Sequence, residues 1–274
     1  MYSQERKTKI IDLLGAQSSV SVNVLADMLH TSKETIRRDL KSLEAEGILT
    51  RTHGGAILNA NPLNVGTAAK YGDTVLNSES PFLLRHGRNI PQKKLIAQKA
   101  ASLIENRDTI FIDNSSTTLF LLDYIPKEMH LTIITYSVKV LLEAAKLENP
   151  NLSLICLAGF YNGNNYSLYG TRTIKSSEEF YPDKTFISCT GVTLNKRLTD
   201  ISLNEIDTKK AMMDKSEETY LLVDHTKFEV AGPFFLGNFN EIDCIVTDNF
   251  NYTPEVSETL RTITKKHGVR IITA

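Results

Sequence analysis

The segment that most constrains the fold of this chain covers residues 31–55, TSKETIRRDLKSLEAEGILTRTHGG. Ser32 can accept the free backbone N–H of Thr35 at a helix start, and Glu34 places negative charge where the helix dipole is positive. We therefore expect a helix to begin near Lys33. A cap that fixes the first residue of a helix also fixes the direction in which each later side chain points.

The helix predicted from this cap has one apolar face and one charged face. At about 100° per residue, Ile36, Leu40 and Leu43 fall within one narrow arc. The opposite side carries Glu34, Arg38 and Lys41, with Arg37 at its edge. Such a helix packs through its apolar face and presents its cations to a partner.

A short hairpin is expected after this helix. Gly47 suits the left-handed residue that commonly ends a helix. Residues 48–51 then read as a strand that turns at Gly54 and Gly55 and returns through residues 56–58. The hairpin has the size and position of a wing.

Two further helices are predicted before the capped one, over residues 3–16 and 22–29, and a polar turn at residues 30–32 follows the second. Their expected apolar sets are Ile10, Ile11, Leu13 and Leu14 in the first and Val24, Leu25, Met28 and Leu29 in the second. A short helix, a tight turn and a longer helix form a helix-turn-helix, whose second helix enters the major groove of DNA. The alternative, a merely solvated charged helix, is the weaker interpretation because cap, turn, preceding helix and hairpin agree.

The charge of this region is nearly balanced. Residues 1–58 hold eight Lys and Arg against seven Asp and Glu, a difference of one. Bulk attraction to DNA phosphates is therefore modest, and affinity must come from the placement of the cations and from two copies on one duplex. The expected DNA-binding residues are Ser32, Lys33, Thr35, Arg37, Arg38, Lys41, Arg51 and His53. For His53, hydrogen bonding within the hairpin is the stronger alternative. We expect a homodimer at least, with a homotetramer as the alternative.

Length and composition favour two domains. The chain has 274 residues, of which 41% are hydrophobic, enough for a substantial core. Residues 59–80 are rich in turn-forming residues and are the expected linker between a DNA-binding domain at 1–58 and a second domain at 81–274. No apolar run suits a membrane helix and no signal region follows the N-terminus, so we expect a cytoplasmic protein without membrane contact. Cys156, Cys189 and Cys244 lie far apart in strand-like runs and are expected to be buried thiols, without a disulfide or a metal site.

The second domain alternates strand-like and helical patterns. The strand-like runs cover residues 109–113, 131–135, 152–157, 184–189, 219–224, 244–247 and 269–273. Strands that alternate with helices indicate a mostly parallel sheet covered on both faces. The predicted fold class is α/β.

Ligands of such sheets bind beyond the carboxyl ends of the strands. The first of these ends is DNSSTT at residues 113–118, where a helix beginning near Leu119 could hold a phosphate on its free N–H groups. Ordinary helix capping is the alternative interpretation of these hydroxyls. Further strand ends or intervening segments carry Thr135, Gly159, Gly191, Lys210, Asp224 and Lys227, each a weak signal by itself.

Two sets of motifs resemble the DeoR family of bacterial regulators of sugar metabolism. TIRRDL at residues 35–40, followed by HGGA at residues 53–56, is similar to the family's DNA-binding domain, and the order of the strand-end motifs is similar to its sensor domain. The resemblance implies a winged helix-turn-helix joined to an α/β sensor like ribose-5-phosphate isomerase and the coenzyme A transferases in fold. It also implies a phosphorylated sugar or related metabolite as effector, and no cofactor.

The same resemblance implies the residues of the effector site. Asp113, Ser115, Ser116, Thr117 and Thr118 would line it, Lys210 would add positive charge, and Asp224 and Lys227 would lie near its rim, while Thr135, Gly159 and Gly191 belong to further family motifs. Three loops depart from the usual family pattern. This chain has Ser115 and Ala158 where the family usually has glycine, and Tyr136 where it usually has asparagine. We therefore expect an altered effector or weakened phosphate binding.

Two classes of function remain open at this point. The first is a metabolite-responsive transcriptional regulator of a carbohydrate operon, expected to be a repressor and to bind double-stranded operator DNA. The second is a sugar-phosphate isomerase with an accessory DNA-binding domain, in which Asp113 and Lys210 would supply the base and its polarising partner. The fused DNA-binding domain favours the regulator, so we expect no enzymatic activity.

Overall fold

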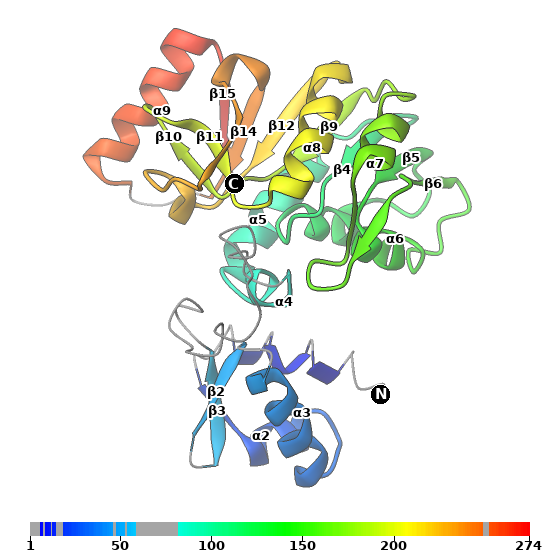
Figure 1. The fold of residues 1–274 in the computed structure, drawn as a ribbon, viewed down its shortest axis with the longest axis vertical. Helices are drawn as coiled ribbons and strands as arrows, with labels where there is room; N and C mark the ends of the chain where they lie inside the picture. Colours follow the sequence, from blue (N-terminus) through cyan, green and yellow to red (C-terminus); the bar gives the residue numbers. More distant parts are fainter. Residues whose placement is uncertain are drawn as a thin grey trace. The chain divides into compact units, whose positions relative to one another are not determined.

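The computed structural model describes residues 6–7, 9–11, 13–14, 19–45, 48–52, 54–58, 82–248 and 252–274 (Figure 1). The chain divides into two compact units, Met1–Ile90 and Pro91–Ala274. Within the described ranges, none of the helices combines the length and the apolar character that crossing a membrane requires. The segment expected to be a linker, residues 59–80, lies outside these ranges, as do Gly47 and His53.

The first unit contains the predicted helix-turn-helix. Its elements after the first helix are β1 (Ser19–Ser21), α2 (Val22–Met28), α3 (Lys33–Ala45), β2 (Leu49–Thr52), β3 (Gly55–Leu58) and α4 (Phe82–His86). Helix α3 begins at Lys33 as predicted, because Ser32 Oγ accepts the N–H of Thr35 at 3.1 Å. The hairpin is also confirmed, but β1 joins it in a three-stranded antiparallel sheet of order β1-β3-β2. A strand of three residues is too short to show a period in the sequence.

The core of this unit confirms most of the predicted apolar faces. Ile36, Leu40 and Leu43 of α3 are fully buried, and so are Ile10, Ile11 and Leu14, whereas Leu13 is only half-buried. The prediction for α2 was partly wrong, because Val24 and Met28 are 42% and 51% exposed. The buried side chains there are Val22, Leu25, Ala26 and Leu29. Their spacing of three, one and three residues defines one helical face that begins with the first residue of α2.

A buried ion pair joins the first helix to α3. Asp39 is 4% exposed and accepts both Arg6 Nε, at 2.5 Å, and Arg6 Nη2, at 3.2 Å. The pKa of Arg6 is raised, chiefly by its hydrogen bond to Asp39. The acid of the TIRRDL motif therefore holds the domain together while the two preceding arginines remain on the surface.

The second unit is built on a seven-stranded parallel sheet of order β15-β14-β12-β9-β4-β5-β6. Its strands are β4 (Thr109–Ile112), β5 (Leu131–Thr135), β6 (Leu152–Cys156), β9 (Lys184–Ile187), β12 (Glu218–Leu222), β14 (Cys244–Thr247) and β15 (Arg270–Thr273). Each of the seven strand-like runs in the sequence became one of these strands. The α/β fold class is confirmed.

Helices connect these strands. They are α5 (Ile90–Ala101), the 3-10 helix η3 (Thr118–Tyr124), α6 (Val138–Ala144), α7 (Thr171–Ser177), α8 (Leu203–Lys215), the 3-10 helices η4 (His225–Lys227) and η5 (Phe239–Glu241), and α9 (Pro254–His267). Helix α8 packs on the sheet next to β9 (Figure 1). In α5 and α8 the buried face includes a lysine, Lys93 and Lys209 respectively.

The order of the strands reverses at the centre of the sheet. From β4 the chain adds β5 and β6 on one side, and β9, β12, β14 and β15 lie on the other. The carboxyl ends of β4 and β9 are neighbours there, and the Asp113 N–H donates to Phe186 O at 3.1 Å. Open α/β sheets bind ligands at such a switch point. The fold thus directs attention to the segments that begin at Asp113 and Ser188.

Five short strands of the second unit were not predicted. They form the antiparallel sheet of β10 (Gly191–Thr193), β11 (Arg197–Asp200) and β13 (Phe234–Gly237), and the hairpin of β7 (Phe160–Asn162) and β8 (Ser167–Tyr169). Each has only three or four residues, and polar or glycine positions interrupt the alternation that marks longer strands.

The three cysteines are free thiols, as expected, but only Cys189 and Cys244 are buried. Burial raises the pKa of Cys189 to about 12 and that of Cys244 to about 11. The prediction was wrong for Cys156, which is exposed. It ends β6, the outermost strand of the sheet, where neighbours exist on one side only.

Candidate DNA-binding and effector sites

The outer face of α3 carries the predicted cations. Arg37 lies 3.6 Å from Glu34, and both side chains are largely exposed. Lys33, Arg38 and Lys41 are exposed as well, and none of them has an acidic partner within the described part of the chain. DNA phosphates or base edges can bind such exposed cations without first breaking an ion pair within the protein.

Two of the expected contact residues are already used in the helix cap. The hydroxyls of Ser32 and Thr35 lie 2.8 Å apart, and Ser32 Oγ also accepts the N–H of Thr35. Their evident task is to set the start and the direction of α3.

Arg51 is tied to the end of α3. Glu44 accepts the backbone N–H of Arg51 at 3.0 Å and its Nε at 2.7 Å. The backbone hydrogen bond from Arg51, followed by the side-chain bond, lowers the pKa of Glu44. This carboxylate holds the wing against the helix.

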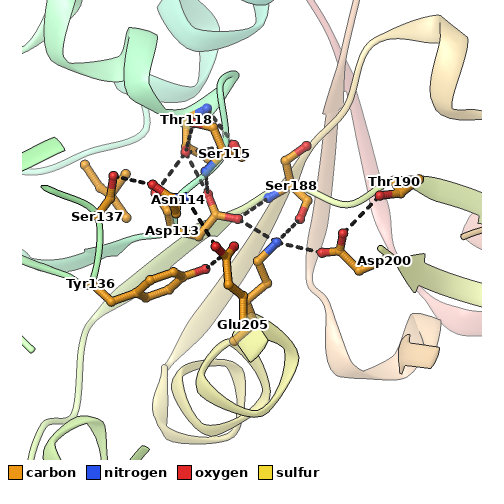
Figure 2. A network of polar contacts seen from close by, with 12 residues as sticks. Asp113, Asn114, Ser115, Thr118, Tyr136, Ser137, Ser188, Thr190, Asp200 and Glu205 are labelled. Carbon is orange, nitrogen blue, oxygen red and sulfur yellow. Dashed lines mark hydrogen bonds and ion pairs between the residues drawn. The ribbon is translucent and has the colours of Figure 1, made fainter. Parts of the chain in front are cut away.

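In the second unit, Asp113 is the centre of a polar network at the switch point (Figure 2). Its Oδ1 accepts the Ser115 N–H at 2.9 Å and the Thr118 hydroxyl at 2.7 Å. Its Oδ2 accepts the Ser188 N–H at 3.0 Å and lies 3.1 Å from Lys209 Nζ. Because Asp113 is fully buried and each oxygen has two donors, this carboxylate shapes the loop and joins it to β9.

The departure from glycine at Ser115 has a structural use. Ser115 Oγ accepts the N–H of Thr118 at 3.0 Å and lies 2.9 Å from the Thr118 hydroxyl. A helix was expected to begin near Leu119, and the structure has the 3-10 helix η3 from Thr118. The first N–H of that helix is therefore capped by Ser115 rather than left for an anion.

Asn114 and Thr135 connect the loop and its strand to neighbouring segments. Asn114 donates to Asn165 O at 2.8 Å and to Glu205 Oε1 at 3.3 Å, and its Oδ1 accepts the Ser137 hydroxyl at 2.6 Å. Thr135 donates to Ile112 O at 2.7 Å, so its hydroxyl fastens β5 to β4.

The cation that the structure brings to Asp113 is Lys209, not Lys210. Lys209 Nζ lies 2.7 Å from Asp200 Oδ2, 2.9 Å from Ser188 O and 3.1 Å from Asp113 Oδ2, which occupies its three hydrogens. Lys210 Nζ instead lies 5.1 Å from the centre of the Phe235 ring. A helical pattern could have found Lys209, because it shares the buried arc of α8 with Ile206 and Met213.

The buried charges of this cluster stabilise one another. Burial alone lowers the pKa of Lys209, but the carboxylates of Asp200, Asp113 and Glu205 outweigh it and raise that pKa well above its usual range. Burial likewise raises the pKa of Asp200, yet the charge of Lys209 outweighs it, so the net pKa is lowered. Both groups are therefore charged at neutral pH.

The middle of the loop contains two backbone N–H groups that make no hydrogen bond within the described residues. Ser116 and Thr117 are 4% and 3% exposed, and within the described residues their backbone N–H groups reach no acceptor. Ser116 Oγ accepts Lys93 Nζ at 3.0 Å, and Lys93 is itself 4% exposed in the first turn of α5. Lys93 was not among the predicted site residues, although it falls on the arc of Ile96, Ala97 and Ala100.

Tyr136 belongs to the core. It is fully buried, its ring lies 5.8 Å from that of Phe111, and its hydroxyl donates to Glu205 Oε2 at 3.3 Å. Burial, and then the charge of Glu205, raises the pKa of Tyr136, which keeps the phenol protonated.

The remaining predicted residues have packing or capping contacts. A Cβ at Gly159 would lie 2.1 Å from Thr173 Oγ1, and one at Gly191 would lie 2.0 Å from Val230 O, so both positions exclude larger residues. Asp224 is buried and accepts the Thr226 N–H at 3.0 Å at the start of η4. Lys227 ends η4 and is half-buried.

Both units match known protein families. Residues 6–61 match the DeoR-like helix-turn-helix domain, and residues 88–249 match the DeoR C terminal sensor domain. The HTH-type transcriptional regulator GolR of Listeria innocua is 34% identical over 91% of this chain and 92% of its own length. IolR of Bacillus subtilis is 32% identical over 85% and 86%. The glycerol-3-phosphate regulon repressor of Escherichia coli is 26% identical over 90% and 92%.

Solved structures give a more distant likeness. Ribose 5-phosphate isomerase A of Methanocaldococcus jannaschii aligns with 51% of this chain and 55% of its own, with 18% identity and a TM-score of 0.37.

Proposed function

Because the chain belongs to the DeoR family of DNA-binding transcriptional regulators, we propose that it represses a carbohydrate-utilisation operon and that a phosphorylated metabolite controls its DNA binding. The relatives support this assignment, since one of them is named a repressor of the glycerol-3-phosphate regulon and another a repressor of a lactose phosphotransferase system. A regulator of this kind acts on the chromosome, so we place it in the cytoplasm.

For the DNA-binding half, the proposed contacts come from the outer face of α3. Lys33, Arg38 and Lys41 meet the duplex directly, and Arg37 does so by leaving its exposed pair with Glu34. Ser32 and Thr35 act by placing the helix, and Arg51 by placing the wing. His53 stays a proposed wing residue outside the described part of the chain.

The test is binding to DNA from upstream of the chain's own gene, measured over a range of salt concentrations. Arg38→Ala is expected to lose about 1–3 kcal/mol of binding free energy if the side chain reads a base. If it contacts a phosphate, the slope of log affinity against log salt becomes shallower by about 0.9. Lys196→Ala, on an exposed turn of the second unit, is the control. Unchanged binding by Arg37→Ala, Arg38→Ala and Lys41→Ala together would refute the assignment of this face.

For the sensor half, we propose that Lys93, Ser116 and Thr117 hold the phosphate of the effector. The observation that carries this proposal is the pair of free, buried N–H groups at Ser116 and Thr117 beside a buried ammonium. Buried donors without acceptors are unfavourable, and a phosphate dianion supplies the oxygens they lack. Asp113, Ser115, Thr118 and Lys209 give the loop its shape.

From the unusual loops we expected either an altered effector or weakened phosphate binding, and this arrangement helps to choose between them. The Ser115 hydroxyl bonds inside the loop and leaves the two N–H groups free, which favours an altered effector over weakened phosphate binding. The other predicted residues, among them Thr135, Gly159, Gly191, Lys210, Asp224 and Lys227, remain candidates for contact with the rest of the effector.

A thermal-shift screen of inorganic phosphate and sugar phosphates tests the sensor site. A ligand at a hundred times its dissociation constant stabilises the folded state by about 2.7 kcal/mol, a readily measured shift. Lys93→Met is expected to lose the shift, whereas Lys94→Met, at a neighbouring exposed lysine, keeps it. Equal shifts in the two variants would show that the phosphate lies elsewhere.

We propose that the chain is not an isomerase. Both oxygens of Asp113 accept two donors, Lys209 has three acceptors, and Lys210 lies over Phe235, so neither a free base nor its partner is present where the alternative function needs them. The relatives above are named as regulators. Turnover of ribose 5-phosphate that survives repurification and disappears in Asp113→Ala would overturn this proposal.

We further propose a homodimer or homotetramer. A DNA-binding region with a net charge near one gains affinity from two copies on one operator. Sedimentation equilibrium of the full chain would decide between dimer, tetramer and monomer.

A further inference from the structure

An acid lies within the cationic face of α3. At about 100° per residue, the side chain of Glu34 points between those of Arg38 and Lys41, on the side opposite the buried face. Glu34 is 74% exposed. A carboxylate at this place repels the phosphates that the neighbouring cations attract, so it lowers the affinity of the face for DNA in general.

The helix itself has little need of this carboxylate. In a capping box, the residue three positions after the cap is a glutamate, but here that residue is Thr35, whose hydroxyl lies 2.8 Å from Ser32 Oγ. Glu34 has an ion pair with Arg37 at 3.6 Å and makes no hydrogen bond within the described chain. Exposed pairs of this kind contribute little to stability, and solvent screens the interaction of an exposed acid with the helix dipole.

The position of Glu34 brings it close to the bases. It is the second residue of α3, and the first residues of a recognition helix are the ones that contact base edges in the major groove. Arg37 follows three residues later, which is about 4.5 Å further along the helix. Base pairs are stacked about 3.4 Å apart, so the two side chains reach neighbouring base pairs of one groove.

The chemistry of the two side chains selects the bases. A carboxylate accepts hydrogen bonds and donates none. On its major-groove edge cytosine presents an amino donor alone, whereas adenine has an acceptor beside its amino group, and guanine and thymine present acceptors. Cytosine is therefore the base that matches Glu34, and guanine, with its two acceptors, is the base that matches Arg37.

We propose that Glu34 determines operator specificity by accepting a hydrogen bond from the amino group of a cytosine, while Arg37 binds a guanine of a neighbouring base pair. In the free protein these side chains form an exposed ion pair, and on the operator each exchanges its partner for a base. On other sequences the carboxylate meets no donor and still repels the phosphates, so it discriminates against them. The proposal rests on the DNA-contacting face of α3 proposed above.

Selection of duplexes from a random-sequence library by the full-length protein tests the proposal. The wild type is expected to select half-sites in which a cytosine and a guanine occupy neighbouring base pairs. Glu34→Ala is expected to lose at least about fivefold discrimination at the cytosine, and Arg37→Ala at the guanine. Glu34→Gln is expected to prefer adenine where the wild type prefers cytosine, because glutamine matches the donor and acceptor of adenine.

A matched acid of the second unit provides the control. Glu258 of α9 has an exposed pair with Arg261, also three residues later, so Glu258→Gln removes the same charge from the same kind of pair. It is expected to select the wild-type sequence. Binding to a duplex without the selected half-site is a second measurement, in which Glu34→Ala is expected to bind more tightly than the wild type because the repulsion is gone.

The outcomes separate this proposal from the one on which it rests. A selected sequence that is unchanged in Glu34→Ala would overturn the role of Glu34. A change confined to the base that Arg37→Ala also affects would overturn it too, because Glu34 would then only position Arg37. Both results leave the contact face standing, whereas unchanged DNA binding by Arg37→Ala, Arg38→Ala and Lys41→Ala together would remove the face and this proposal with it.

Discussion

At the scale of single residues, the buried acids Asp39 and Asp113 both accept donors from other elements. Asp39 of α3 accepts Arg6 from the first helix, and Asp113 accepts donors from its own loop, from Ser188 and from Lys209. Removing one member of such a set leaves a buried charge without a partner, which destabilises a protein far more than the loss of an exposed pair. A single substitution at one of these residues is therefore expected to lower stability without removing a side chain proposed to contact DNA or the effector.

Asp39→Ala is expected to destabilise the first unit by about 3 kcal/mol, because Arg6 is left without its carboxylate. Circular dichroism during urea unfolding measures the change. Asp27→Ala, at an exposed acid of α2, serves as the control and changes stability by less than about 0.5 kcal/mol. Equal effects of the two substitutions would mean that the Arg6–Asp39 pair contributes nothing to folding.

Lys209→Met is expected to lower the melting temperature of the second unit at neutral pH, whereas Lys210→Met leaves it nearly unchanged. The folded-state pKa of Asp200 lies below its ordinary value of 3.8, so the stability from its pairing is present above that value and is lost as the pH falls through the folded pKa. The gap between wild type and Lys209→Met should therefore shrink in acid. A gap that is constant with pH would contradict the pairing.

At the scale of elements, the sequence predicts what is long, apolar and regularly spaced. The seven strands of the parallel sheet were predicted because strands covered on both faces are continuous apolar runs. Strands such as β11, Arg-Leu-Thr-Asp, carry no such signal. The sequence named Lys210 as the cation near Asp113, whereas the structure places Lys209 there, since residue type alone does not distinguish Lys209 from Lys210, or Lys93 from Lys94. Only the position of a lysine on the buried arc of its helix does so.

The attachment of the wing to α3 gives a prediction at this scale. Glu44→Ala frees the Arg51 side chain, so unfolding free energy should fall by less than about 1 kcal/mol, while the salt dependence of DNA binding becomes steeper by about 0.9. Glu258→Ala, which breaks the exposed pair with Arg261 in the second unit, is the control and keeps the wild-type slope. A slope that is unchanged in Glu44→Ala would show that Arg51 does not approach a phosphate.

At the scale of the whole molecule, the chain divides into two compact units, each with buried hydrophobic residues. Differential scanning calorimetry of the full chain is therefore expected to show two transitions. Asp39→Ala should lower one of them, and inorganic phosphate should raise the other, because a ligand stabilises the unit that binds it. A single transition that both changes move equally would contradict this division of the chain.

Both oxygens of the Asp113 carboxylate are fully hydrogen-bonded, and this affects how the sequence of the loop can change during evolution. The fold of the loop depends on Asp113, Ser115 and Thr118, whereas Ser116 and Thr117 leave their N–H groups unused. Under the phosphate site proposed above, the positions that shape the loop and those that bind the effector differ within six consecutive residues, 113–118. A substitution of the Ser116 or Thr117 side chain leaves the hydrogen bonds among Asp113, Ser115 and Thr118 in place, so these two positions can vary without rebuilding the loop.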